Sequence, residues 1–321
     1  MSAVKKVPAP GARRVEAPAP GRVASVAGPG NGIAPPPPAV APAIRAAAGA
    51  PPAAAPRPAP QGAAVGSSQP PAADPVAVAG SRRLPTGVKR LDQLLGGGIA
   101  PGSAVLLYGP PFLGKEVLAR RFFQTAVESR TPGVYVLTNA ATADVRKDLA
   151  ESAAYTKAES QHLARFVDTY SRSVGADDAF RDAEFLDGAL DLNGITLAVN
   201  KVQADIIADH DAHAFVLDSI STLVAYTNPA TAFRFLQTLI GRTRRVGATS
   251  LFLMDQGMHA DADVQMFKHL MTGVIEVRDA NGKPQMRVEG LGAPVGVGWV
   301  DYKFDKSQLE ITGSFAAGRI R

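Results

Sequence analysis

The stretch Ser103-Ala-Val-Leu-Leu-Tyr-Gly-Pro-Pro-Phe-Leu-Gly-Lys-Glu116 decides the fold of this chain. An apolar run of strand length (104–108) breaks at Gly109, and a helical pattern of apolar residues begins at Val117. Between them the glycines and the lysine have the spacing G-x-x-x-x-G-K. Such glycines let successive N–H groups point into one concavity, and the following helix adds its positive N-terminal end. The stretch therefore predicts a strand, a phosphate-binding loop and a helix.

The residues expected to contact a nucleotide are those of the loop itself: Gly109, Pro110, Pro111, Phe112, Leu113, Gly114, Lys115 and Glu116. Glu116 departs from the pattern, because the residue after the lysine is normally a serine or threonine whose hydroxyl holds Mg²⁺. A carboxylate can hold Mg²⁺ directly, but it also places negative charge beside the phosphates. We expect the loop to bind phosphates, and whether it also catalyses stays open.

A second signature is the apolar run 214–217, which ends in Asp218 about 100 residues after the loop. A buried strand of this kind delivers a carboxylate to the edge of a sheet, where it can hold Mg²⁺ through water. Asp218 and Glu116 are therefore the predicted metal ligands, and ATP with Mg²⁺ is the expected cofactor pair.

The rest of the globular part alternates apolar strands with helical patterns, which indicates βαβ units. We predict an α/β fold: a twisted, mostly parallel sheet flanked by helices, with an antiparallel hairpin near the C-terminus. The predicted helices are 88–95, 143–154, 195–208 and 231–246; the predicted strands are 104–108, 133–138, 165–170, 214–218, 250–256, 273–278, 285–289, 297–303 and 308–312. Residues 177–191 are expected to form loop and partial helix, and Asn281-Gly282 marks the turn of the hairpin.

Residues 1–83 differ in composition from the rest, which we assign to one nucleotide-binding domain, 84–321. They are rich in alanine, proline and glycine, and they cannot bury enough apolar surface to offset the entropy of ordering. They carry nine basic and two acidic side chains, a formal charge of +7 against +5 for the whole chain, so residues 84–321 carry −2. We expect a disordered basic tail that serves as a solvated linker or contacts a protein partner; nucleic acid is a less favoured partner.

Several classes of protein are disfavoured by composition. The N-terminal residues contain no continuous apolar segment of a secretory signal, and no run of about 18 apolar residues predicts a membrane span. The chain has no cysteine, which excludes disulfides and thiolate chemistry and fits a cytoplasmic protein. The motif His259-Ala-Asp-Ala-Asp263 favours helix capping by an aspartate over a metal site.

The segment Thr86-Gly-Val-Lys-Arg-Leu-Asp-Gln-Leu-Leu-Gly-Gly-Gly-Ile99, followed by Pro101-Gly-Ser103 and the loop, resembles the opening of KaiC-like ATPases of the RecA superfamily. The resemblance covers residues 84 to about 313 and, with one phosphate loop, implies a single-domain relative. It implies a catalytic glutamate at the end of the second strand, where this chain has Asn139 and Ala140. Neither is a general base at neutral pH, although Asn139 can orient a water or sense a phosphate.

The resemblance also implies a polar γ-phosphate sensor after the strand 250–254, where Asp255 and Gln256 stand. In KaiC-like hexamers the strand after the hairpin turn supplies basic residues to a neighbour's ATP, and the matching positions here are Arg287 and Glu289. The binding parts of the family pattern are thus retained, whereas its catalytic parts are replaced.

Three hypotheses follow from this pattern. The favoured one is an ATP-binding switch or scaffold with weak or no hydrolysis, in which Asn139 and Asp218 are weak candidates for catalysis. The second is an active, oligomeric ATPase that uses unconventional carboxylates such as Glu116 or Asp144. The third is a DNA-interacting recombinase paralogue, against which the acidic core and the lack of an aromatic–basic stripe argue.

Overall fold

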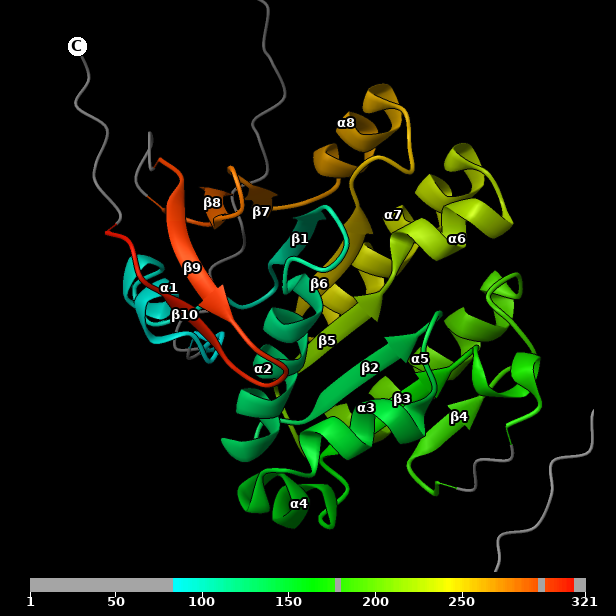
Figure 1. Cartoon of the computed structure of the whole chain (residues 1–321). Coiled ribbons are helices and arrows are strands. Elements are labelled where there is room, and N and C mark those ends of the chain that lie inside the picture. Colours follow the sequence, from blue (N-terminus) through cyan, green and yellow to red (C-terminus); the bar gives the residue numbers. More distant parts are fainter. Residues whose placement is uncertain (1–82, 177–179, 294–297, 315–321) are drawn as a thin grey trace, which may run out of the picture. The chain divides into compact units, whose positions relative to one another are not determined.

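The computed structural model describes residues 83–176, 180–293 and 298–314. The predicted tail lies outside these residues except for Arg83. Within the described residues, ten strands form one sheet in the order β10-β9-β8-β7-β1-β6-β5-β2-β3-β4, with helices on both faces (Figure 1). The strands are β1 (Ala104–Gly109), β2 (Gly133–Leu137), β3 (Ala164–Asp168), β4 (Ala183–Phe185), β5 (His213–Asp218), β6 (Ala248–Asp255), β7 (Gly273–Asp279), β8 (Pro284–Gly290), β9 (Val300–Phe304) and β10 (Leu309–Ile311).

The sheet is parallel from β7 to β4 and antiparallel from β7 through β8 and β9 to β10. In the centre, Leu106 of β1 lies beside Phe252 of β6 and Val274 of β7. Asn281 and Gly282 both have positive φ in the β7–β8 turn, as an Asn-Gly hairpin requires. The predicted α/β fold with a C-terminal antiparallel hairpin is confirmed.

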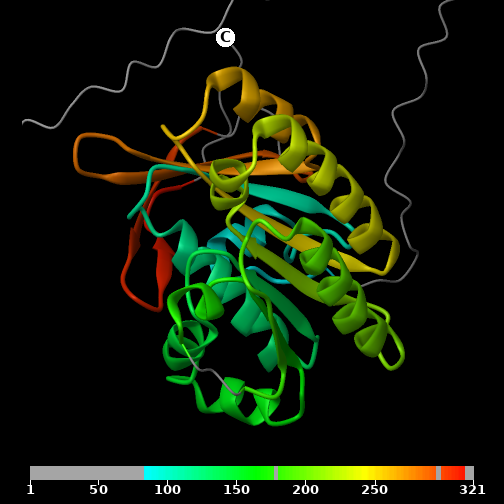
Figure 2. The same ribbon diagram turned by 90° about the vertical axis from the view of Figure 1, so that its right-hand side faces the viewer.

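The helices are α1 (Lys89–Leu94), α2 (Lys115–Glu128), α3 (Thr142–Leu149), α4 (Ala153–Glu159), α5 (Leu192–Ile207), α6 (Ile220–Tyr226), α7 (Pro229–Arg245) and α8 (Asp261–His269). Because successive strand residues face opposite sides, the central strands β1, β2, β3, β5, β6 and β7 contribute to two cores. The first core joins the sheet to α1–α4, and the second joins it to α5–α8. Figure 2 shows α5 and α7 along one side of the sheet and α2–α4 on the other.

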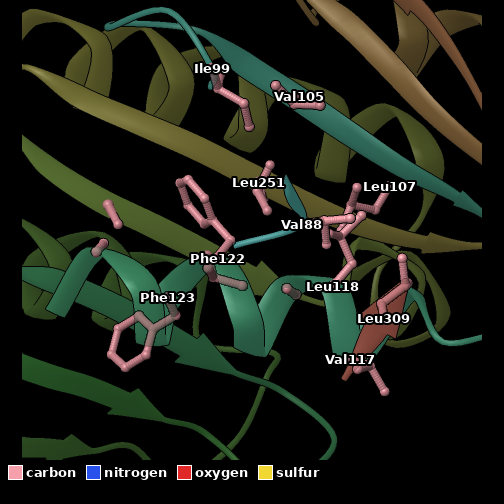
Figure 3. Packing of buried hydrophobic residues seen from close by; sticks show 14 of the residues in the cluster. Val88, Ile99, Val105, Leu107, Val117, Leu118, Phe122, Phe123, Leu251 and Leu309 are labelled. Atoms are coloured by element: carbon pink, nitrogen blue, oxygen red, sulfur yellow. The ribbon is translucent and has the colours of Figure 1, made fainter. Parts of the chain in front are cut away.

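Helix α2 is the central element of the first core. Its apolar residues recur with helical period, and Leu118, Phe122 and Phe123 are fully buried. In Figure 3, Leu118 and Phe122 point from α2 toward Leu107 and Leu251 on the neighbouring strands. This packing fixes the start of α2 directly after the phosphate loop.

Three local predictions were wrong. The predicted helix 143–154 is two helices, because α3 ends at Leu149 and the Ser152 hydroxyl caps α4 by accepting the Tyr155 N–H at 3.3 Å. The segment 180–191 contains the edge strand β4 rather than a helix. Asp261 and Asp263 lie in the first turn of α8, whose N-cap is Ala260, so neither aspartate caps it.

Among the described residues, no helix is both long and apolar enough to span a membrane.

Candidate functional site

The predicted site residues converge at one edge of the sheet. Parallel strands end at the same edge, and β1, β6 and β5 lie side by side there. Gly109 pairs in register with Asp255 of β6, and the Gln256 N–H donates to the Gly109 carbonyl at 2.9 Å. The phosphate loop, the end of β5 and the end of β6 are thus brought together.

Close packing makes the two motif glycines necessary. A Cβ atom on Gly109 would lie 2.4 Å from Val277 Cγ2, and one on Gly114 would lie 2.7 Å from the ring of Phe304. Gly114 also has a φ of 77°, which disfavours any other residue. A side chain at either position would collide with a neighbouring strand, so the loop can lie where it does only with glycine at both positions.

Phe112 stands out within the loop. It has a φ of 63° although it is not glycine, and 89% of its surface is exposed. Pro111 beside it is also exposed, whereas Leu113 is half-buried. The sequence pattern does not distinguish these middle positions, so the exposed aromatic ring is a finding of the structure.

The ammonium group of Lys115 is held by carboxylates. Its Nζ lies 2.7 Å from Glu116 Oε1 and 2.6 Å from Asp255 Oδ1, and it donates to the Pro110 carbonyl at 3.3 Å. The side chain is only 2% exposed. Burial works to lower the pKa of Lys115, but the hydrogen bonds and charges of Asp255 and Glu116 outweigh it and raise that pKa. Lys115 is therefore a cation with two anionic partners.

Asp218 is buried at the end of β5. Burial first, and the negative charge of Glu116 second, raise the pKa of Asp218 from 3.8 to about 6. The following peptide is held by Thr138 at the end of β2, whose hydroxyl donates to the Asp218 carbonyl at 2.9 Å and accepts the Ser219 N–H at 2.7 Å. Glu116 and Asp218 thus act on each other electrostatically.

A hydrogen-bond network that the sequence did not predict links β6 to α6. The Ser221 hydroxyl accepts the Asp255 N–H at 2.8 Å, and His259 Nε2 lies 2.9 Å from the same oxygen. Burial lowers the pKa of His259, although the charge of Asp255 opposes this. His259 therefore orients Ser221, and through it the backbone of Asp255 beside Lys115.

No carboxylate stands at the two positions where the catalytic glutamate was expected. Asn139 is exposed and Ala140 half-exposed, just after β2. Asp168, at the end of the next strand, fixes this region: its carboxylate accepts both the N–H and the hydroxyl of Thr142 and of Ser171, and the N–H of Tyr170. Asp144 is exposed in the first turn of α3.

Arg287 is engaged within its own chain. Its Nη2 lies 2.7 Å from Glu276 Oε2 and 2.9 Å from Glu289 Oε1, and its guanidinium lies 4.8 Å from the ring of Trp299. Glu289 thus pairs with the arginine two residues before it.

The acidic residues of this edge bear on whether Mg²⁺ fits the site. In the described part of the chain no three acidic or histidine side chains form a ready metal cluster. Mg²⁺ usually needs one or two carboxylates, completed by phosphate oxygens and waters. Asp218 at the end of β5 and Glu116 beside Lys115 supply that number of carboxylates, and Lys115 supplies a cation for phosphates.

Comparison with known proteins agrees with this geometry. The model of the family described as "ATPase: KaiC" matches residues 84–288. A UPF0273 protein of Pyrococcus furiosus is 30% identical over 174 residues, which are 54% of this chain and 68% of that protein. The DNA repair protein RadA of Mycobacterium tuberculosis is 33% identical over 91 residues, which are 28% of this chain and 19% of that protein.

A similar fold occurs in the crystal structure of a KaiC-like protein from the hyperthermophilic archaeon Pyrococcus horikoshii. Its TM-score is 0.55 at 18% identity, and the match covers 72% of this chain and 98% of that one. The family match spans most of the described residues, including the phosphate loop and Asp218. The chain therefore belongs to the KaiC family of ATPases.

Proposed function

We propose that this protein binds ATP with Mg²⁺ and acts as a nucleotide-dependent switch or scaffold, with little or no hydrolysis. The loop from Gly109 to Lys115 would hold the phosphates, and Asp218 and Glu116 would hold the metal ion. Bound Mg²⁺ would neutralise phosphate charge. The observation that carries the proposal is the ion pair between Lys115 and Glu116. Glu116 occupies the position of the serine or threonine whose hydroxyl normally holds Mg²⁺.

The charge balance at this edge supports binding without fast turnover. The carboxylates of Glu116 and Asp255 pair with Lys115, and the pKa of a third carboxyl group, that of Asp218, responds to the charges of Glu116 and Lys115. Phosphoryl transfer depends on a positioned nucleophile and on cations that stabilise the spreading negative charge. Asn139 offers no base, and Arg287 is neutralised by two glutamates, so both requirements are poorly met in this chain.

Binding and turnover are to be measured on the same full-length sample. Titration calorimetry with Mg-ATP gives the affinity, and phosphate release under the same conditions gives the turnover rate. Lys115→Ala should abolish binding, whereas Lys147→Ala, which removes an exposed lysine of α3, should not.

The expected result is saturable binding with less than one phosphate released per protein over the experiment. Multiple turnovers that disappear in Lys115→Ala would identify an active ATPase instead. No binding by either the wild type or Lys147→Ala would refute the proposal.

A further inference from the structure

Strand β9 lies against the phosphate loop, although the two are far apart in the sequence. The hydroxyl of Tyr302 donates a hydrogen bond to the carbonyl of Leu113, the residue before Gly114. Phe304, two residues further along the strand, faces the same side, and its ring occupies the space where a Gly114 side chain would be. Tyr302 is almost fully buried, and its ring centroid lies 6.0 Å from that of Phe304.

The bond from Tyr302 sets the orientation of one loop peptide. In a trans peptide the C=O and the next N–H point in opposite directions. Because the Leu113 carbonyl points to Tyr302, the Gly114 N–H points away from β9. Such N–H groups are the donors that bind phosphate oxygens in a loop of this kind. Tyr302 thus orients a loop N–H of the kind that binds phosphate.

The β9–β10 hairpin is joined to the rest of the sheet by a short stretch of strand pairing. Strand β9 pairs with β8 at two positions, Gln285 with Asp301 and Met286 with Val300. Strand β10 pairs with β9, and its following residues are held by Arg90 of α1, which donates to the Thr312 and Gly313 carbonyls at 3.2 and 2.7 Å. Val300, Leu309 and Ile311 of the hairpin are also buried in the first core, so a change in the loop conformation would reach a packed element through Tyr302 and Phe304.

We propose that Tyr302 and Phe304 are positioning residues that hold the phosphate loop in its binding conformation and couple its occupancy to the β9–β10 hairpin. This inference rests on the proposed nucleotide binding and names the element of the fold that responds to it. By linkage, whatever stabilises the hairpin against the loop strengthens binding of the triphosphate, and bound triphosphate stabilises the hairpin equally.

The test compares Tyr302→Phe with Tyr155→Phe in the full-length protein. Each variant removes one buried tyrosine hydroxyl; that of Tyr155 bonds to Glu159 within α4 at 3.2 Å. Since one hydrogen bond contributes modestly, Tyr302→Phe should weaken Mg-ATP binding by about three- to tenfold. Tyr155→Phe should bind as the wild type does, and the melting temperatures of both variants show whether they remain folded.

Hydrogen exchange on the wild type provides a measurement that needs no substitution. Saturating Mg-ATP should slow exchange of the backbone amides of β9 and β10, and Lys115→Ala should show no such slowing. Equal affinities of Tyr302→Phe and the wild type, or unchanged exchange in the hairpin of a nucleotide-saturated wild type, would overturn the inference and leave the proposed function intact. Failure of the wild type itself to bind Mg-ATP would refute both.

Discussion

Asp218 provides the sharpest energetic test of the site. Its carboxyl group is buried at the end of β5, and its pKa is raised to about 6 by burial and by the charge of Glu116. The substitution Asp218→Asn removes the charge while keeping the size and shape of the side chain. We expect this variant to be more stable than the wild type at neutral pH, because ionising Asp218 in the folded state is costly.

The magnitude follows from the two pKa values. The folded state holds the proton of Asp218 between the ordinary value of 3.8 and about 6, so wild-type stability falls as the pH rises through this window. The full difference corresponds to about 3 kcal/mol, and it is reached above pH 6. Near pH 4 the unfolded state still holds part of the proton, so the stability difference is a small fraction of this value.

The assay is thermal unfolding of both proteins between pH 4 and pH 8 in the presence of EDTA. For a domain of this size, 3 kcal/mol corresponds to a rise in Tm of about 6–12 °C at pH 8. The exposed aspartate Asp209, changed to asparagine, serves as the matched control. A difference between Asp218→Asn and the wild type that is absent, or equal at pH 4 and pH 8, would refute the reasoning.

Three further predictions concern Asp168, Gly114 and Glu116. Asp168→Ala should lower the free energy of unfolding by about 3 kcal/mol or more in urea titrations, because five donors lose their acceptor. Burial opposes ionisation of Asp168, but the hydrogen bonds from Ser171 and Thr142 outweigh it and lower the pKa of this carboxyl group. The stability that the Asp168 carboxylate contributes is therefore present above pH 3.8 and is lost as the pH falls below that value. An effect of Asp168→Ala that is unchanged at low pH would contradict this. Gly114→Ala should abolish Mg-ATP binding in calorimetry, whereas Gly188→Ala, with open space around its Cβ, should bind normally. Glu116→Thr should tighten Mg-ATP binding by about tenfold without restoring turnover, because the variant removes a negative charge beside the phosphates and its hydroxyl can hold Mg²⁺ in place of the carboxylate. Rapid phosphate release by this variant would show that Glu116 alone prevents catalysis.

The main features of the fold could be read from the sequence because they depend on local patterns. The spacing of Gly109, Gly114 and Lys115 between an apolar run and an amphipathic pattern predicts a strand, a loop and a helix, as found. Asp218 ends its strand at the expected edge for the same reason. The break between α3 and α4 was missed because the alanine-rich sequence there favours helix, while Ser152 caps a new one.

The remaining features of the site depend on contacts between distant segments. The Tyr302 hydroxyl and the Leu113 carbonyl are separated by 189 positions, and Ser221 and His259 by 38. No periodicity or motif in one segment encodes such a partner, since the contact exists only once the sheet has formed. Arg287 differs from these cases, because the register of a hairpin that turns at Asn281-Gly282 places Glu276 opposite it, and local sequence could have indicated that pair.

The central claim, that this chain holds ATP without turning it over, is tested most directly by nucleotide retention. The full-length protein is incubated with Mg-ATP, desalted and denatured after several hours, and the released nucleotide is identified, with Lys115→Ala treated in parallel. We predict intact ATP from the wild type and no nucleotide from Lys115→Ala. Recovery of ADP in place of ATP would contradict the claim of weak hydrolysis. Recovery of no nucleotide from the wild type would contradict stable binding.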